Sequence, residues 1–170
     1  MKHDEVRKLV IGSLLLALSL VIPLAMGGIL GVVIGPFSAT LASHVPTFIA
    51  MLYGPLVAAA VGTGSALGFF MRLGPVVGAR AAMHIPVGIA GSLLLRRGVS
   101  FPVTLALMAP LHGLLESLVV LLFNFTLQDA GYLVGVGTLL HHTMDSIIAI
   151  ACWRALFYRG IGTPEGTARV

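Results

Sequence analysis

Long apolar segments cover most of this chain, and short stretches with glycine, proline or charged residues separate them. A helix that crosses a membrane needs about 20 mostly apolar residues, with a usual range of roughly 17 to 25. By this measure the sequence predicts six spans, over residues 8–26, 36–53, 55–71, 75–95, 101–125 and 132–157. Pro46, Pro86 and Pro110 lie inside spans and predict kinks or broken turns. We therefore expect an all-α integral membrane protein, a compact bundle of six transmembrane helices.

Ionisable side chains interrupt these apolar spans in a regular way. Six of seven form pairs four residues apart, Arg80 with His84, His112 with Glu116 and His141 with Asp145, and His142 is the seventh. Residues at this spacing share one face of a helix. A charge in hydrocarbon is costly, so ionisable residues within spans usually face a polar interior and mark a functional site. We expect the helices that carry these pairs to turn their polar faces toward one pocket.

The depth of these residues sharpens this expectation. At ~1.5 Å per residue, the paired residues lie roughly 8 to 18 Å from the outer ends of their helices. His44 has a similar depth on the second span, and Arg72 lies near the outer end of the third. We therefore predict an outward-opening pocket that includes both of them. His141 and His142 point about 100° apart on a helix, so one is expected to orient helices and the other to contact the ligand.

Composition supports a membrane protein. The chain has 170 residues, of which 58% are hydrophobic and 9% charged, whereas soluble domains have about 25% charged residues. This length suits one transmembrane domain over residues 1–170. No glycine-rich loop of the Walker type is present, so the chain is not expected to hydrolyse ATP or to act as an enzyme. Cys152 is the only cysteine, which excludes an intrachain disulfide.

The basic residues predict the topology. Most lie near the chain ends or in one short loop: Lys2, Arg7, Lys8, Arg96, Arg97, Arg154, Arg159 and Arg169. Lysine and arginine are enriched in cytoplasmic loops, and with six spans all of these residues fall on one side. Both termini of this multi-pass protein are thus predicted to be cytoplasmic, and the net charge of +4 does not indicate nucleic-acid binding. Arg72 and Arg80 lie toward the opposite face and are candidates for ligand contacts.

A family resemblance rests on five segments that follow one another along the chain. They are PFSATLASHVP (36–46), GTGSALGFF (62–70), RAAMH (80–84), PLHGLLE (110–116) and GTLLHHTMD (137–145). With them the chain resembles, over nearly its whole length, the substrate-binding S components of energy-coupling factor (ECF) vitamin transporters. It is most similar to the niacin-type members. The resemblance implies a six-helix protein of a prokaryotic cell membrane that binds a vitamin from outside with high affinity, without a cofactor or an ATPase of its own.

The resemblance also implies partners. An S component docks onto a transmembrane coupling protein and two cytoplasmic ATPases, and it topples in the bilayer to release its substrate inward. Family members dock through small residues spaced four apart on the first helix. Here Ser13 and Ala17 have that spacing, but the next position is Val21. Ser13 and Ala17 are therefore the candidate docking residues.

Nicotinate suits the predicted pocket chemically. An arginine can hold a carboxylate through two parallel hydrogen bonds, and Arg80 is the first candidate, with Arg72 as a second contact or gate. A histidine N–H or a protonated carboxyl group could donate to the ring nitrogen. Alternatively, Arg80 forms a permanent salt bridge with Glu116 or Asp145. Aromatic residues near the outer face could cover the ring: Phe69, Phe70, Phe123 and Tyr132.

Charge leaves the mechanism open. Arg72 and Arg80 balance Glu116 and Asp145 when every histidine is neutral, so an anionic ligand requires an extra proton in the pocket. Histidines with acids could instead hold a transition-metal ion for uptake. Acid–base pairs could serve an intramembrane enzyme, although HExxH, a serine elbow and a partnered cysteine are absent from the sequence. Intramembrane acids and histidines also occur in proton-coupled carriers.

Overall fold

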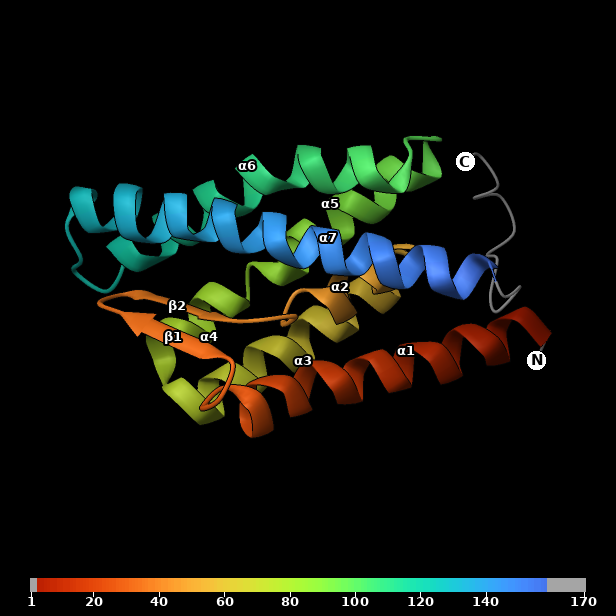
Figure 1. The fold of residues 1–170 in the computed structure, drawn as a ribbon, viewed down its shortest axis with the longest axis horizontal. Coiled ribbons are helices and arrows are strands. Elements are labelled where there is room, and N and C mark those ends of the chain that lie inside the picture. The colour runs from red at the N-terminus through yellow and green to blue at the C-terminus, as the bar shows by residue number, and fades with distance from the viewer. Residues whose placement is uncertain (1–2, 159–170) are drawn as a thin grey trace.

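The computed structural model describes residues 3–158 and is mainly helical (Figure 1). Its elements, in order, are α1 (His3–Val21), the π-helical turn η1 (Ile22–Met26), β1 (Gly31–Ile34), β2 (Phe37–Thr40), α2 (Val45–Met51), α3 (Pro55–Leu73), α4 (Pro75–Ala81), α5 (His84–Arg96), α6 (Phe101–Leu121), the π-helical segment η2 (Asp129–Val136) and α7 (Gly137–Tyr158). Within the described residues, five segments are long and apolar enough to cross a membrane: Glu5–Met26, Pro55–Leu73, Pro75–Arg96, Phe101–Leu121 and Asp129–Leu156.

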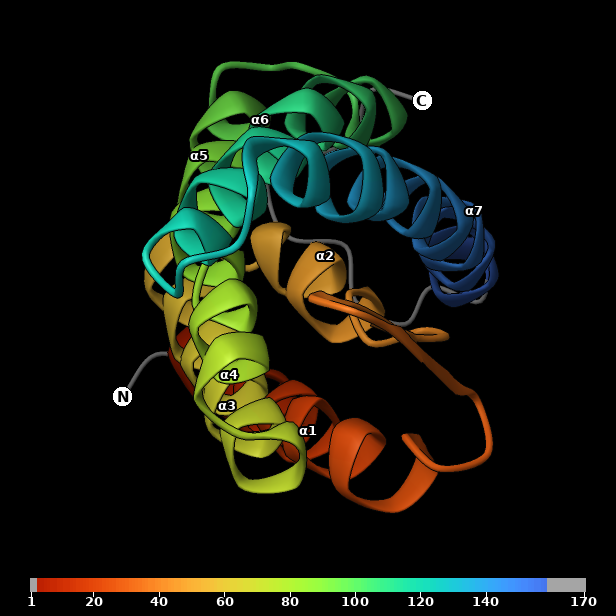
Figure 2. The same cartoon turned by 90° about the vertical axis from the view of Figure 1, so that its left-hand side faces the viewer.

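The predicted second span, residues 36–53, is not one continuous helix. Its first part is β2, which pairs with β1 in an antiparallel hairpin, and its last part is the seven-residue helix α2. Alternate side chains of β2 are buried, and α2 is buried along almost its entire length. Figure 2 shows α2 in the middle of the bundle, with the long helices around it. Because protein surrounds this segment, its backbone does not need the continuous hydrogen bonding that a lipid-exposed span requires.

Glycine and proline set the boundaries of α3 and α4. Gly54 and Gly74 have φ of +118° and +84°, a region that favours glycine, and each precedes the first residue of a helix. Pro55 and Pro75 occupy those first positions, where the missing N–H has no helical partner. Sharp reversals therefore precede α3 and α4.

The predicted fourth span, 75–95, is broken into α4 and α5 between Ala81 and His84. The break lies just before Pro86. In a regular helix the ring of this proline would clash with the carbonyl group one turn earlier, and proline has no N–H to donate to it. The expectation of a broken turn is therefore confirmed at Pro86. By contrast, α6 continues through Pro110, and Pro46 lies at the start of α2.

The ends of the last two predicted spans also differ from the prediction. Helix α6 ends at Leu121, not at 125, and Asn124 then adopts a left-handed φ of +63°. Asparagine is one of the few residues that tolerate this conformation at a helix end. The final helical segment begins at Asp129, before the predicted 132, and the Asp129 carboxylate accepts a hydrogen bond from the Thr126 hydroxyl at 2.7 Å.

Small residues let α3 pack against helices on two sides. A Cβ added to Gly62 would lie 2.9 Å from the backbone nitrogen of Ile85 on α5. One added to Gly68 would lie 2.8 Å from the Pro23 ring of η1. Larger side chains at these positions would force α3 away from its neighbours. The glycines therefore set the close packing of α1, α3 and α5 around the interior.

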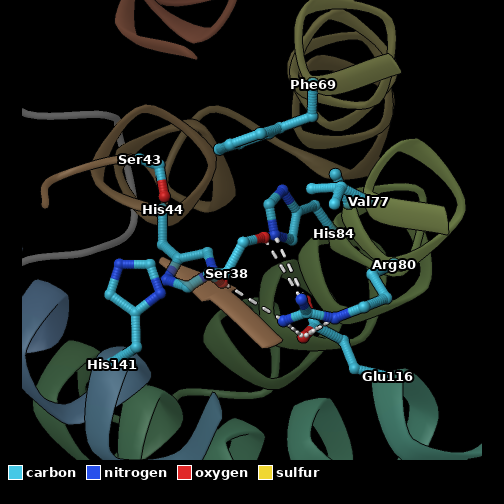
Figure 3. A pocket seen from close by; sticks show the side chains of 10 residues that line it. Ser38, Ser43, His44, Phe69, Val77, Arg80, His84, Glu116 and His141 are labelled. Atoms are coloured by element: carbon cyan, nitrogen blue, oxygen red, sulfur yellow. Dashed lines mark hydrogen bonds and ion pairs between the residues drawn. The ribbon is translucent and has the colours of Figure 1, made fainter. Parts of the chain in front are cut away.

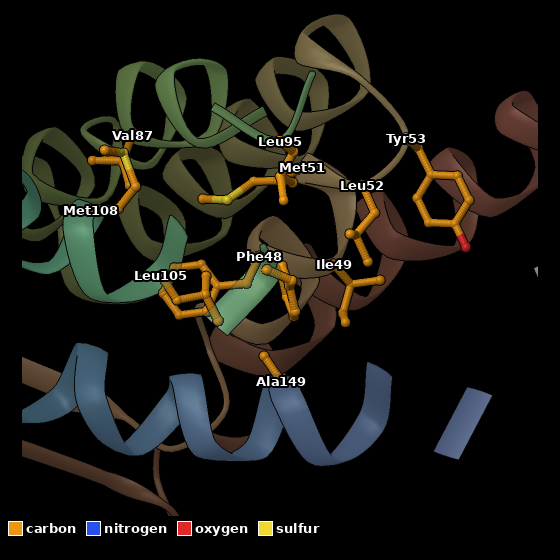
Figure 4. Packing of buried hydrophobic residues seen from close by; sticks show 11 residues of the cluster. Phe48, Ile49, Met51, Leu52, Tyr53, Val87, Leu95, Leu105, Met108 and Ala149 are labelled. Atoms are coloured by element: carbon orange, nitrogen blue, oxygen red, sulfur yellow. The ribbon is translucent and has the colours of Figure 1, made fainter. Parts of the chain in front are cut away.

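The interior has an apolar half and a polar half. The apolar core surrounds α2 and includes Phe48, Met51, Val87, Leu105 and Ala149 (Figure 4). The polar side chains gather between this core and the hairpin. Many large apolar side chains lie on the outside, for example Leu14 on α1, which is 61% exposed. An apolar exterior around a partly polar interior is the pattern of a protein that faces lipid.

The basic residues of the described chain divide as the topology prediction expects. Helix α1 begins and α7 ends at one end of the molecule, where α5 also ends, and the hairpin lies at the opposite end (Figure 1). Near the first of these ends, Arg7 and Lys8 lie in the early part of α1, Arg96 ends α5 and Arg97 follows it, and Arg154 lies near the end of α7. The second carries Arg72 and Arg80. Lys2, Arg159 and Arg169, which also entered the topology prediction, lie outside the described residues.

Candidate functional site

A small cavity lies beneath the hairpin, and polar side chains dominate its walls (Figure 3). It has a volume of about 20 Å³ and is lined by Ser38, Ser43, His44, Phe69, Val77, Arg80, Ala81, His84, Glu116 and His141. These residues come from β2, the turn that follows it, α3, α4, α5, α6 and α7. The fold thus brings residues from most of the chain to one point.

Arg80, in the last turn of α4, is buried and fully hydrogen-bonded. Its Nε and Nη2 donate to Glu116 Oε2 at 3.1 and 2.6 Å. Its Nη1 donates to the Pro36 carbonyl at 2.9 Å and to the Ser38 hydroxyl at 3.2 Å, and Nη2 also donates to the Ser38 carbonyl at 3.4 Å. A guanidinium has five N–H donors, so a ligand carboxylate must displace one of these partners. The salt bridge to Glu116, one of the two alternatives for Arg80, is present.

Glu116 is the acidic centre of the site, and its two oxygens have different surroundings. Oε2 accepts hydrogen bonds from Arg80 and from the Thr138 hydroxyl, the latter at 2.6 Å. Oε1 faces two histidines, with His112 Nε2 at 3.2 Å and His84 Nε2 at 3.9 Å. The carboxylate therefore has one oxygen held by fixed donors and one directed toward imidazole nitrogens.

Asp145 lies behind the cavity wall and holds the turn between β2 and α2. Oδ1 accepts a hydrogen bond from the backbone N–H of Ala42 at 2.8 Å, and Oδ2 accepts one from the N–H of His44 at 2.9 Å. Ala42 has a left-handed φ of +67°, which costs an L-residue about 1–2 kcal/mol. Asp145 Oδ2 also lies 3.1 Å from His44 Nδ1 and 3.2 Å from His141 Nε2. This aspartate therefore joins α7 to the turn that carries His44.

The two adjacent histidines on α7 point to different places. His142 is buried, and its Nε2 donates to the Leu105 carbonyl on α6 at 3.0 Å. Its Nδ1 lies 3.0 Å from His112 Nδ1. His141 lines the cavity, and its Nε2 donates to the Thr40 carbonyl at 3.1 Å. His142 therefore links α7 to α6, while His141 faces the cavity. The ligand contact expected of one of the two histidines stays a prediction.

Five of the nine predicted pocket residues line the cavity: His44, Arg80, His84, Glu116 and His141. His112, His142 and Asp145 form the layer directly behind them. Arg72 does not join the cluster: it is exposed in the last turn of α3 and does not line the cavity. The structure does not place Arg72 at the cavity, and its role as a second contact or gate stays a prediction. Both arginines lie in the last turn of a helix, but Arg72 is exposed whereas Arg80 is buried.

Of the aromatic candidates, only Phe69 lines the cavity. Phe70 and Tyr132 are 54% and 74% exposed, and Phe123 lies outside the lining. Ser38 and Ser43 line the cavity but were not predicted. Both lie in residues 36–53, which the sequence predicts as one regular helix. The side chains that share a face of such a helix differ from those that the actual strand and turn direct toward the cavity.

One curated relative aligns with most of this chain. The chain is 33% identical over 172 aligned residues to the niacin transporter NiaX of Lactococcus lactis subsp. cremoris, and the alignment covers 91% of this chain and 77% of NiaX. The chain belongs to the family of this niacin transporter. No family model matches the chain, and no solved structure matches it either.

Membership of the niacin transporter family confirms the resemblance to niacin-type proteins that the five sequence segments predicted. Together with the apolar helices, it identifies a membrane transport protein with a vitamin-related role. The cavity beneath the hairpin is then the natural candidate for the substrate site, because most of its polar side chains lie within otherwise apolar helices.

Proposed function

We propose that this protein is the niacin-binding S component of an ECF importer in a prokaryotic cell membrane. The observation that carries the proposal is the 33% identity to a niacin transporter over 91% of the chain. The buried arginine of the cavity supplies a group that suits a carboxylate ligand. The protein itself is not an enzyme in this proposal, and partner ATPases supply the energy.

The proposed topology has six passes with both termini in the cytoplasm. Five are the long helical segments. The sixth is the path through β2 and α2, which runs inside the bundle from the hairpin end toward the end with the basic residues (Figures 1 and 2). The positive-inside rule places that basic end in the cytoplasm. The hairpin and the cavity then face outward, the side from which substrate arrives.

The structure corresponds to a closed form in this proposal. A cavity of about 20 Å³ has room for about one water molecule, and nicotinate needs several times more space. Hydrogen bonds from Arg80 to Pro36 and Ser38 hold the hairpin over the cavity. Substrate entry therefore requires the hairpin to move outward and its bonds to Arg80 to break. A nicotinate carboxylate can then take the place of the lost acceptors.

Isothermal calorimetry on the purified protein tests the substrate. We expect saturable binding of nicotinate at one molecule per chain. Nicotinamide, which has the same ring without the carboxylate charge, serves as the matched control ligand and is expected to bind at least tenfold more weakly. Absence of binding for both compounds would remove niacin as the substrate while leaving the family membership intact.

We also expect the exposed small residues of α1 to form the docking face. Ser13 and Ala17 are exposed on this helix and are flanked by the exposed Leu14 and Leu18. Replacing both small residues with leucine should reduce copurification of the coupling protein and ATPases at least tenfold, since the added side chains block close helix packing. Ala106→Leu on the exposed face of α6 is the control. The nicotinate affinity of the Ser13→Leu, Ala17→Leu variant should stay within twofold of wild type. Undiminished copurification of the partners with this variant would mean that docking uses another surface.

A further inference from the structure

Four buried side chains bring metal-ligating atoms together at the inner side of the cavity. His44, His84, His112 and Glu116 each offer one such atom, and these atoms all lie within 4.8 Å of one another. They come from the residue that precedes α2, from the start of α5 and from α6. Imidazole and carboxylate groups are the ligands that Zn²⁺, Co²⁺ and Ni²⁺ accept in proteins.

The hydrogen bonds around His112 leave its Nε2 without a proton when the histidines are neutral. The Leu105 carbonyl can only accept, so His142 Nε2, 3.0 Å away, carries the N–H. The Nδ1 of a neutral His142 is then an acceptor, and His112 Nδ1 donates to it at 3.0 Å. The remaining nitrogen, His112 Nε2, presents a lone pair toward the cavity.

That lone pair faces another one. His112 Nε2 lies 3.2 Å from Glu116 Oε1, but within the described residues it has no partner in hydrogen-bond geometry. Two acceptors at this distance repel each other unless a proton or a metal ion lies between them. Two ligands of one tetrahedral zinc ion, each about 2.0–2.2 Å from the metal, are about 3.3–3.6 Å apart. The spacing of this nitrogen and oxygen therefore suits a shared metal ion.

Two of the other three ligands, His84 and Glu116, are held by a second layer of hydrogen bonds, as in known metal sites. His84 Nδ1 pairs with the Ser65 hydroxyl at 2.8 Å, which leaves Nε2 directed toward Glu116. Glu116 Oε2 is held by Arg80 and Thr138, which leaves Oε1 available. Histidine ligands commonly have a carboxylate at their second nitrogen. Asp145 Oδ2 lies 3.1 Å from His44 Nδ1, although not in hydrogen-bond geometry.

We propose that His44, His84, His112 and Glu116 bind one first-row transition-metal ion, such as Zn²⁺. The cavity volume of about 20 Å³ suffices for an ion, and the side chains need to approach one another by only about 1–1.5 Å to reach ligand spacing. The proposal does not rest on niacin as the substrate. It adds a resident cation to a cavity whose buried arginine is already neutralised by Glu116.

Titration with Co²⁺ tests this site, because a tetrahedral Co²⁺ centre absorbs strongly in the visible range. The protein is purified without a histidine tag, treated with a chelator and titrated in the absence of nicotinate. We expect the absorption to saturate at one ion per chain and Zn²⁺ to abolish it. A rise in the midpoint of thermal unfolding with Zn²⁺ is the second readout, since a ligand of the native state stabilises it.

Variants locate the ion. His84→Ala and His112→Ala should each weaken Co²⁺ binding at least tenfold. Cys152→Ser is the matched control, because Cys152 is a possible metal ligand that is exposed and outside the proposed ligand set, and the substitution should change affinity less than twofold. No saturable spectrum and no thermal shift in the wild-type protein would overturn the proposal. A loss of binding in His141→Gln but not in His84→Ala and His112→Ala would also overturn it, because it would assign the ion to the second group of His44, His141 and Asp145. Nicotinate binding is measured in a separate calorimetry experiment on the chelator-treated protein. The metal proposal can therefore fail while the niacin proposal holds, and the reverse.

Discussion

Replacing Arg80 with alanine should abolish nicotinate binding and destabilise the protein by about 3–5 kcal/mol, the usual cost of removing one partner of a buried ion pair. Arg80 is 3% exposed, and so is Glu116. Without the guanidinium, the Glu116 carboxylate keeps the Thr138 hydroxyl as a donor but loses its charged partner. The hairpin also loses the hydrogen bonds that Arg80 donates to Pro36 and Ser38.

Arg72→Ala is the matched control, because this arginine is exposed and lies outside the cavity lining. It should leave both the unfolding midpoint and the nicotinate affinity close to wild type. The measurements are thermal unfolding in detergent and calorimetry with nicotinate. Wild-type affinity in Arg80→Ala would contradict the role of this residue in the site, and a wild-type midpoint would contradict a stabilising buried pair.

A double variant separates stability from binding. Arg80→Met combined with Glu116→Gln removes both charges together, and buried ion pairs can often be replaced by uncharged groups of similar size at little cost. We expect this protein to unfold at a temperature nearer to wild type than Arg80→Ala does, yet still to fail to bind nicotinate. Recovery of binding in the double variant would show that Arg80→Ala had acted through stability alone.

The convergence of the polar residues could be predicted from the sequence, because it follows from local periodicity and from the cost of charge in an apolar environment. Residues four apart on a helix must share a face, and that face must avoid lipid. His84, Glu116 and His141 therefore meet, although they are far apart in sequence. The same reasoning could not predict how the hairpin closes over them.

The hairpin was missed because hydropathy alone does not distinguish a lipid-facing helix from a buried strand and short helix. Residues 36–53 are apolar enough for a span, yet they form β2, a turn and α2. Short apolar runs are ambiguous in this respect. Arg72 was expected in the pocket from its depth and from its position opposite the other basic residues, and neither specifies the direction of a side chain. The partners of Asp145, backbone groups 101 and 103 residues away, have no sequence signal.

Replacing Asp145 with asparagine should destabilise the protein by about 3 kcal/mol or more, because this carboxylate accepts hydrogen bonds from two distant backbone N–H groups. The Asp145 carboxylate is fully buried, and it faces the N–H groups of Ala42 and His44 and two imidazole nitrogens. A carboxylate accepts with both oxygens, whereas an asparagine amide must direct one NH₂ group at donors. Each buried polar group left unpaired costs about 1–3 kcal/mol.

Two further variants make this prediction specific. Asp129→Asn is the matched control, since Asp129 accepts only exposed hydrogen bonds from Thr126, and it should cost less than about 1 kcal/mol because a local, exposed cap contributes little beyond that. Ala42→Gly in the Asp145→Asn background should recover about 1 kcal/mol, because glycine adopts the left-handed conformation of residue 42 without the penalty of alanine. Thermal unfolding of all three proteins provides the comparison. Equal midpoints for Asp145→Asn and Asp129→Asn would show that the turn before α2 holds its shape without α7, and the orientation of His44 would then need another cause.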